Sequence, residues 1–433
     1  MAVPHSALSL AAPATSPITH VVIIDQENHS FDNVLGRLCV RLGRCDGTTT
    51  GRLANGRRIR LSKAKDVVSA VNHSVASQRT AIDGGRMDGF SHIEGCLRRI
   101  RFRCYSQYQP GQVPNLTALA SNFVISDRTF EDGPVPSWGS HLDLVAATLD
   151  GFTGDNPVPL RHHRPGPGWG CDSFSLAQWR ASASTPLRWV PACVPNRHGN
   201  GAFRPTPVEW VPTIMDVMDR ADVTWRIYQT TTDDPGGISG GYGWAICPTF
   251  ADCLNTSQAK NMAPSSAVID DARSGTLPNV SLVMPNGRNS QHNGFSMRKG
   301  DNWIGKVVGA IEQGPDWPNT AIFITYDDCG CFYDHVAPPP DLGIRVPMVI
   351  VSPYAKRHFT DTGVASFSSL LAFIEHDFGL PPLSERDANA YDYSNSFDLS
   401  KASLAPVPMT HSRIPASELR YIAAHPPSES DFT

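Results

Sequence analysis

The 433-residue sequence lacks several features that mark common classes of protein. No window approaches the roughly 20 apolar residues of a membrane-spanning helix, so we predict no transmembrane segment. The formal charge is −4, the pI is near 6.4 and no Lys/Arg block is present, which argues against a nucleic-acid partner. The N-terminal residues lack a basic start followed by a long apolar core, so no signal peptide is predicted.

Charge is also scarce overall, while turn-forming residues are plentiful. Charged residues make up only 18% of the chain, against 35 glycines and 36 prolines, which indicates many ordered loops rather than disorder. The length would suit two or three average domains, or one large α/β enzyme with long insertions.

The ten cysteines form no Cys-x-x-Cys motif, so local disulfides are favoured over a zinc cluster. They fall in close pairs within Gly- and Pro-rich loops: Cys39 with Cys45, Cys96 with Cys104, Cys171 with Cys193, Cys247 with Cys253, and Cys329 with Cys331. The last pair also fits free thiols, because a Cys-x-Cys bridge is strained. Disulfides form in oxidising compartments, so we expect a secreted or extracytoplasmic protein.

Apolar runs typical of strands alternate with segments that have helical periodicity. We predict strands at 20–24, 123–127, 223–229, 279–285, 321–327 and 346–353, and helices at 141–149, 211–221, 302–314 and 367–379. This alternation predicts an α/β fold with a mostly parallel central sheet covered by helices on both faces. Ligand sites in such sheets lie at the carboxyl ends of the strands.

Two of the predicted strands end abruptly in side chains that carry oxygen ligands. The run AIFITY leads into Asp327 and Asp328, and HVVIID leads through Gln26 into Glu27 and Asn28. Burying such carboxylates is costly unless a cation compensates, so the two strand ends together predict a metal site. The oxygen donors suit one divalent ion, Ca²⁺, Mg²⁺ or Mn²⁺; Zn²⁺ is less favoured because it more often recruits His or Cys as well.

Ser137 and Ser140 lie just before the helix predicted to begin at His141. A hydroxyl near the N–H groups at a helix N-terminus occupies an anion-binding position, and a metal beside Ser137 would make it a nucleophile. The alternative is that one of these serines is only an N-cap, which the sequence slightly favours for Ser140 and leaves open for Ser137. His73, His141, His292 and His335 lie in polar or Gly/Pro-containing segments and are candidates for proton transfer.

Several ordered blocks resemble one family, the bacterial phosphoesterases that include non-haemolytic phospholipases C and secreted acid phosphatases. The blocks are Asp25 to Asp32 (DQENHSFD), Gly85 to Phe90 (GRMDGF), Pro136 to Trp138 (PSW), Ser290 to His292 (SQH), Tyr326 to His335 (YDDCGCFYDH) and Gly343 to Pro353 (GIRVPMVIVSP). The resemblance implies an alkaline-phosphatase-like three-layer sandwich, with the disulfide-stapled, loop-rich segments as insertions.

The resemblance also implies roles for individual residues. The implied metal ligands are Glu27, Asn28, Asp327, Asp328 and Ser137, with Ser137 also the nucleophile. His292 and His73 match active-site histidines of the family, and His335 matches a position where substrate contact is expected. Gln291 and Asn293 stand where the family usually has an acidic residue and a proline, and Ser137 stands where many phospholipase members have Thr, so substrate preference does not transfer.

We therefore expect a flexible segment at 1–17, a phosphoesterase domain at 18–400 with a loop-rich cap at 151–257, and a C-terminal tail at 401–433. The expected substrate is a phosphoester small molecule or a phospholipid headgroup, hydrolysed through a seryl-phosphate. A phospholipase C-like diesterase is favoured over an acid phosphatase. A sulfatase lacks support because no Cys/Ser-x-Pro-x-Arg sequence surrounds Ser137, and a metal-binding module without activity would leave Ser137 and the histidines unexplained. Tryptophans of the cap, Trp244 among them, could hold a choline-like cation.

Overall fold

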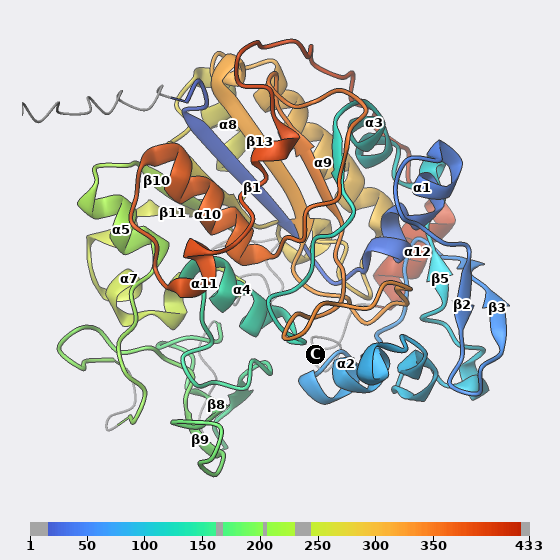
Figure 1. The fold of residues 1–433 in the computed structure, drawn as a ribbon, viewed down its shortest axis with the longest axis horizontal. Coiled ribbons are helices and arrows are strands. Elements are labelled where there is room, and N and C mark those ends of the chain that lie inside the picture. Colours follow the sequence, from blue (N-terminus) through green and yellow to red (C-terminus); the bar gives the residue numbers. More distant parts are fainter. Residues whose placement is uncertain (1–15, 162–167, 202–205, 230–243, 426–433) are drawn as a thin grey trace, which may run out of the picture.

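An eight-stranded sheet forms the centre of the computed structural model, with strand order β11-β10-β12-β1-β13-β14-β6-β15 (Figure 1). The structure describes residues 16–161, 168–201, 206–229 and 244–425. The predicted segment at 1–17 therefore lies almost wholly outside the described residues. The strands of the sheet are β1 (His20–Gln26), β6 (Val124–Ser126), β10 (Trp225–Gln229), β11 (Met262–Pro264), β12 (Val280–Val283), β13 (Thr320–Tyr326), β14 (Met348–Val351) and β15 (Thr360–Asp361).

The sheet is mostly parallel, which confirms the predicted fold class. β14 is the exception, since it pairs antiparallel with both β13 and β6. The segment between β13 and β14 contains no helix, so the chain turns back at the same edge of the sheet instead of crossing over. β6 again runs parallel to β1, and its carboxyl end faces the same edge.

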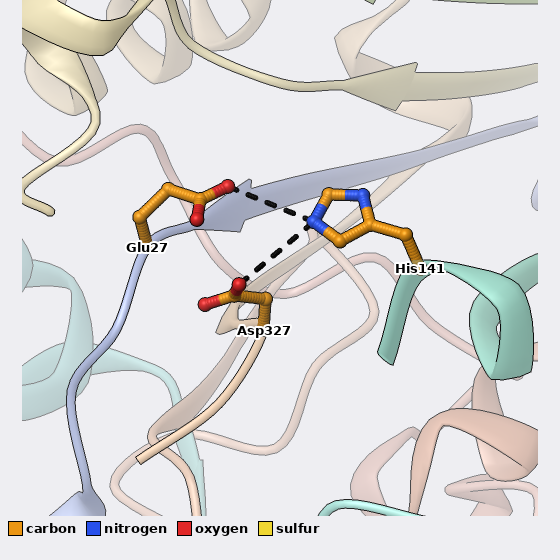
Figure 2. A group of neighbouring side chains, drawn as sticks. All are labelled: Glu27, His141 and Asp327. Atoms are coloured by element: carbon orange, nitrogen blue, oxygen red, sulfur yellow. Dashed lines mark ion pairs between the residues drawn. The ribbon is translucent and has the colours of Figure 1, made fainter. Parts of the chain in front are cut away.

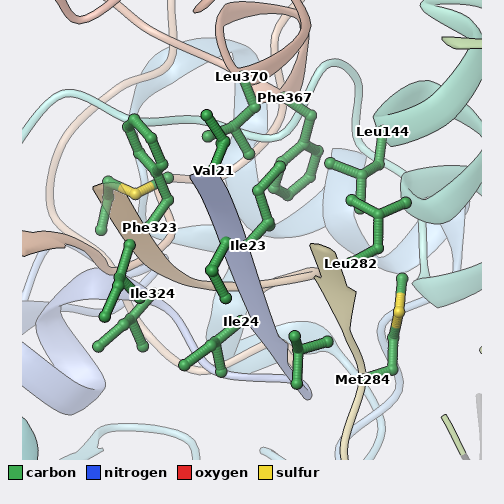
Figure 3. Packing of buried hydrophobic residues seen from close by; sticks show 14 of the residues in the cluster. Val21, Ile23, Ile24, Leu144, Leu282, Met284, Phe323, Ile324, Phe367 and Leu370 are labelled. Atoms are coloured by element: carbon green, nitrogen blue, oxygen red, sulfur yellow. The ribbon is translucent and has the colours of Figure 1, made fainter. Parts of the chain in front are cut away.

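Helices cover both faces of the sheet, which is why its central strands are apolar without alternation. Figure 3 shows Val21 and Ile23 of β1 packed toward Leu144 and Phe367, whereas Ile24 points to the opposite side. The helices are α1 (Arg37–Leu42), α2 (Val75–Ile82), α3 (Pro114–Asn122), α4 (Ser137–Ala146), α5 (Ile214–Arg220), α7 (Ala251–Asn255), α8 (Ala267–Ser274), α9 (Met297–Glu312), α10 (Phe367–Phe378), α11 (Glu385–Ala388) and α12 (Ala416–Ala424). Each of the long helices predicted from periodicity is present with shifted ends.

The insertions carry small sheets and the disulfides. A three-stranded sheet of β7 (Val158–Pro159), β8 (Ser175–Trp179) and β9 (Arg188–Pro191) forms part of the cap and projects from the core at the lower edge of Figure 1. β2 (Thr50–Arg52) pairs with β3 (Arg58–Arg60), and β4 (Ser62–Lys63) pairs with β5 (Ser106–Gln107). All five cysteine pairs expected from the sequence are joined, including Cys329 with Cys331.

The C-terminal segment runs over the outside of the central layers. Thr410 exchanges two hydrogen bonds with Asn115 of α3, and the backbone N–H of Val407 donates to Glu312 at the end of α9. None of the residues of α12 is buried. The described part of the predicted tail therefore contacts the helices through hydrogen bonds and adds Leu404 to the hydrophobic core, whereas α12 adds no buried residue.

Candidate active site

The register of β1 against β13 brings the two predicted ligand pairs together. The strands are parallel and Gln26 lies opposite Tyr326, so the residues that follow each strand meet at one edge. The backbone N–H of Asn28 donates to Asp327 Oδ1 at 2.8 Å. Asn28 has a φ of 63°, a left-handed conformation that asparagine tolerates better than most residues.

Ser137 approaches this edge from α4. Its Oγ lies 3.4 Å from Glu27 Oε2, 3.4 Å from Asn28 Oδ1 and 3.2 Å from Asp328 Oδ2. One hydroxyl proton can satisfy only one of these three acceptors at a time. The five residues expected to bind metal are therefore adjacent and buried, with Ser137 facing ligand oxygens from both strand ends.

The prediction that the helix begins at His141 was wrong, because α4 begins at Ser137 itself. Pro136 is the N-cap and makes no side-chain capping bond, so neither serine is a cap. The Ser140 hydroxyl instead donates to the backbone carbonyl of Asp327 at 2.6 Å. Ser137 is thus at the first turn of a helix, where the positive end of the helix dipole favours negative charge.

Two histidines fix the orientation of the Asn28 side chain. His73 Nδ1 lies 2.8 Å from the carbonyl of Val71, and His292 Nδ1 lies 2.8 Å from the carbonyl of Asn293. Since a carbonyl only accepts, each Nδ1 carries hydrogen, and a neutral ring leaves Nε2 as an acceptor. Burial lowers the pKa of His73 to about 4, which keeps that ring neutral. Asn28 Nδ2 lies 2.8 Å from His73 Nε2 and 3.2 Å from His292 Nε2, so the amide donates toward both rings.

This orientation turns the amide oxygen of Asn28 toward other acceptors. Asn28 Oδ1 lies 2.9 Å from Glu27 Oε2 and 3.2 Å from Asp327 Oδ1. Reversing the amide would relieve these contacts, but both histidines would then have to carry hydrogen on both ring nitrogens. A divalent cation among the oxygens explains the arrangement without charging the rings, and carboxylate, amide and hydroxyl oxygens are the donors that hard cations take. The residues present therefore fit the expected metal.

The charges at the site also favour a bound cation. Burial raises the pKa of Glu27, and the charge of Asp327 adds to that rise. Burial likewise raises the pKa of Asp328, again with Asp327 as the nearest repelling charge. Among the described residues, no Lys or Arg forms an ion pair with these carboxylates. A bound cation would supply the missing positive charge.

His141 lies one helical turn after Ser137 and faces the same carboxylates. Its Nε2 is 3.6 Å from Glu27 Oε1 and 3.9 Å from Asp327 Oδ2 (Figure 2). The i, i+4 spacing places both side chains on one face of α4. Nε2 has no hydrogen-bond partner within the described residues, so it is available to the site as a ligand or a proton carrier.

His335 lies apart from this group. Its Nδ1 is 2.6 Å from Asp32 Oδ2 and its Nε2 is 3.0 Å from Asp46 Oδ1, so both ring nitrogens are engaged elsewhere. Burial opposes the charge of the ring, but the hydrogen bond and charge of Asp32 raise the pKa of His335 to about 9. The buried guanidinium of Arg345 pairs with Asp334 in the same cluster at 3.2 Å. These contacts favour a structural ion-pair network and do not bring His335 to the predicted metal ligands.

Two carboxylates near the site were not proposed as functional from the sequence. Asp25, in β1, lies 3.9 Å from His141 Nε2, and Glu131 accepts from the backbone N–H of Cys329 at 2.8 Å. The ring of Trp244, one of the tryptophans considered for a choline-like cation, stacks on His292 with centroids 5.8 Å apart. Asp25 directly precedes the Gln26-Glu27-Asn28 segment in the sequence. Glu131 begins the segment that leads to Ser137. Both are positions that a search for carboxylates near strand ends could have included.

Residues 18–381 match the Phosphoesterase family. The chain belongs to this family. Its relatives include phospholipases C, in agreement with the resemblance of the sequence blocks. One relative is the non-hemolytic phospholipase C of Burkholderia pseudomallei (strain K96243), 30% identical over 224 residues, which cover 38% of this chain and 32% of that protein. Another is the non-hemolytic phospholipase C of Pseudomonas aeruginosa, 24% identical, with 90% of this chain and 58% of that protein covered.

The phosphoesterase chain thus spans about a third to a little over half of the length of these two relatives. A third relative, phospholipase C B of Mycobacterium tuberculosis, is 22% identical, with 88% of this chain and 78% of that protein covered. The chain is also similar to a solved structure of a protein in the alkaline phosphatase superfamily from Vibrio parahaemolyticus. The TM-score is 0.40 and the identity is 10%, with 88% of this chain and 71% of that chain covered. No helix among the described residues has the length and apolar character needed to cross a membrane.

Removing one predicted ligand carboxylate tests the predicted metal site of this phosphoesterase. We expect Asp328→Asn to lower the affinity for a divalent ion by at least about tenfold, because an anionic ligand is lost. The measurement is the rise in thermal midpoint on titration with Ca²⁺, Mg²⁺, Mn²⁺ or Zn²⁺, after treatment with a chelator. Asp301→Asn is the matched control, since Asp301 is a buried carboxylate that accepts from the N–H groups of Asn115 and Leu116 instead. Equal responses of the two variants would refute the site.

The pKa of His335 predicts a loss of stability at alkaline pH. A pKa raised from 6.5 to about 9 stabilises the fold fully below pH 6.5, and this contribution disappears as the pH rises through about 9. The expected loss is up to about 3 kcal/mol. Thermal midpoints of the wild type and His335→Gln, measured from pH 6 to pH 10, should converge as the pH increases. His376→Gln is the control, because His376 pairs with Asp392 at the surface. A constant gap between wild type and His335→Gln would contradict the assignment.

Proposed function

We propose that this chain is a metal-dependent phosphoester hydrolase that acts through a phosphorylated Ser137. The observation that supports this most directly is the position of Ser137 Oγ, 3.2 to 3.4 Å from oxygens of Glu27, Asn28 and Asp328. A bound divalent ion would lower the pKa of the hydroxyl and offset charge on the phosphoryl oxygens. Membership in the Phosphoesterase family agrees with this chemistry.

In the proposed reaction Ser137 Oγ forms a bond to phosphorus while the bond to the leaving oxygen breaks on the opposite side. The hydroxyl proton passes to a neighbouring carboxylate, of which Asp328 Oδ2 is the nearest. His73 and His292 hold the Asn28 amide, which keeps its oxygen directed at the site. His141 is the candidate to protonate the leaving alkoxide, because its Nε2 faces the site without a hydrogen-bond partner among the described residues. In the second step water forms a bond to phosphorus while the bond to Ser137 Oγ breaks; the proton released by water passes to His141, and the proton on Asp328 returns to Ser137.

We infer a phosphodiester substrate of the phospholipid headgroup type. A diester carries one negative charge fewer than a monoester dianion, and no Lys or Arg within the described residues pairs with the ligand carboxylates to balance a dianion. The stacked rings of Trp244 and His292 add an aromatic surface beside the site, which suits a choline-like cation. The names of the relatives also point to phospholipids. The five disulfides support an extracytoplasmic location.

Replacing the nucleophile tests the mechanism. We expect Ser137→Ala to lower kcat on p-nitrophenyl phosphorylcholine by at least about a thousandfold, because the covalent step is lost. Ser281→Ala should retain activity, since Ser281 is a buried serine in β12 whose hydroxyl has no hydrogen-bond partner among the described residues. Mass spectrometry of acid-quenched enzyme should find phosphate on Ser137. Retention of more than about a hundredth of wild-type turnover by Ser137→Ala would overturn the assignment.

Substrate choice is tested by comparing a diester with a monoester. We expect kcat/KM for p-nitrophenyl phosphorylcholine to exceed that for p-nitrophenyl phosphate by at least about tenfold, since the site offers no cationic side chain for the extra charge. Both assays use the same enzyme preparation with the same divalent ion. The reverse preference would support an acid phosphatase instead.

A further inference from the structure

The small sheet of the cap exposes several large apolar side chains. Trp189 is 53% exposed, Leu187 48%, Phe174 44% and Val158 44%. These four belong to β7, β8, β9 or the residue that directly precedes one of these strands. Side chains of this size are normally buried unless they meet a partner, and clusters of them mark interaction surfaces.

Strand pairing places Val158 and Trp189 on one face of this sheet. Val158 lies opposite Leu176, and Trp189 lies opposite Gln178. Directly paired residues point to the same side, and so do Leu176 and Gln178, two residues apart in β8. The alternate residues Ala177 and Trp179 are buried on the other face. The face that carries Trp189 is therefore the unpacked side of the sheet.

A cavity adjoins this face. Its volume is about 260 Å³, and its lining consists of Val158, Gln178 and Trp189 of the small sheet with Ser74, Pro136, Asp155 and Asn156. Ser74 follows His73, and Pro136 precedes Ser137. A molecule bound to the exposed face would therefore lie next to Ser74 and Pro136, which are the sequence neighbours of His73 and Ser137.

The part of the cap that carries the small sheet, residues 151–200, differs in the sign of its net charge from the rest of the cap and from the whole chain. Residues 151–200 contain five arginines and two aspartates, with no lysine or glutamate, whereas the full chain has a formal charge of −4. Arg161 and Arg180 are exposed and lie within two residues of the ends of β7 and β8. Arg188 instead pairs with Trp179 and stacks on its ring, 4.9 Å from the ring centroid, on the packed face. The patch is therefore apolar, with a basic rim formed by Arg161 and Arg180. Anionic lipid headgroups complement such a rim, and half-exposed tryptophan is favoured at the boundary between lipid and water.

We propose that the face formed by Val158 and Trp189, with the exposed Phe174 and Leu187 at the starts of β8 and β9, docks on the surface of an anionic phospholipid membrane. This choice of occupant rests in part on the proposed function, because a phospholipid diester reaches the enzyme in a bilayer. Docking at this face places the headgroup layer at the cavity lined by Pro136, the residue before Ser137, while the acyl chains stay in the membrane.

The test measures binding separately from turnover. Ser137→Ala protein is mixed with vesicles of phosphatidylcholine and phosphatidylglycerol, and the bound fraction is measured by flotation. We expect Phe174→Ser/Leu187→Ser on this background to lower the partition coefficient by about tenfold or more, because two exposed apolar groups no longer enter the lipid. The control is Leu419→Ser/Tyr421→Ser, two residues of α12 that are 50% and 49% exposed, and it should bind like the parent.

Salt and lipid charge provide a measurement that needs no substitution. Binding of the parent should weaken as NaCl is raised and should be much weaker on vesicles of phosphatidylcholine alone. In the catalytic background, Phe174→Ser/Leu187→Ser should lose activity on vesicles but keep activity on soluble p-nitrophenyl phosphorylcholine, which also shows that it folds.

The docking surface is refuted if the parent does not float with vesicles, or if the two double variants bind equally. It is also refuted if Phe174→Ser/Leu187→Ser abolishes a dimer seen by light scattering while leaving vesicle binding intact, since the face would then join two copies. If the wild-type enzyme does not turn over the soluble diester while the parent still binds vesicles, the proposed function is overturned and the docking surface remains supported.

Discussion

The site depends on the parallel pairing of β1 with β13. Because Gln26 and Tyr326 are in register, the first residues beyond each strand meet at one edge. Nearly 300 residues separate the two strands, so sheet formation alone brings Glu27 and Asn28 to Asp327 and Asp328. The other side chains of the site reach this edge from different elements: Ser137 from α4, His73 from the loop before α2 and His292 from the loop before α9.

The site concentrates negative charge where water is excluded, and the rest of the structure limits the resulting cost. Asp327 accepts from the N–H of Asn28, and Asp328 accepts from the N–H of Gly330 at 2.7 Å. The beginning of α4 adds the positive end of a helix dipole beside Ser137. These interactions orient the oxygens without neutralising them, which keeps the carboxylates available to a cation. The Asp32, Asp334 and His335 cluster differs, because the buried Arg345 already supplies its positive charge.

The sequence was sufficient for the features set by short-range pattern. Apolar runs predicted β1, β13 and the mostly parallel sheet, and polar residues at their ends predicted the ligand pairs. The antiparallel direction of β14 was not predictable from its apolar run, because direction depends on the helix-free connection that precedes it. The start of α4 was misplaced because Ser137, Trp138 and Gly139 have no strong helical pattern, and tertiary contacts decide the first turn.

Long-range partners account for the other differences. His335 follows the acidic pair by only seven residues, yet its position is decided by Asp32 and Asp46, which the local sequence does not reveal. Asp25 is sequence-adjacent to the ligands and became recognisable only when His141 was seen to face it. The roles of His73 and His292 could be proposed from the sequence. Their shared contact with one amide required coordinates.

We propose that one divalent cation is held by the two strand ends together with Ser137. The most direct measurement is a crystal structure of the protein loaded with Mn²⁺, with anomalous scattering collected near the metal edge. We expect an anomalous peak bonded to oxygens of Glu27, Asn28, Asp327 and Asp328, with Ser137 Oγ within bonding distance. A peak between Asp32, Asp334 and His335, or a peak beyond bonding distance of Ser137, would contradict it.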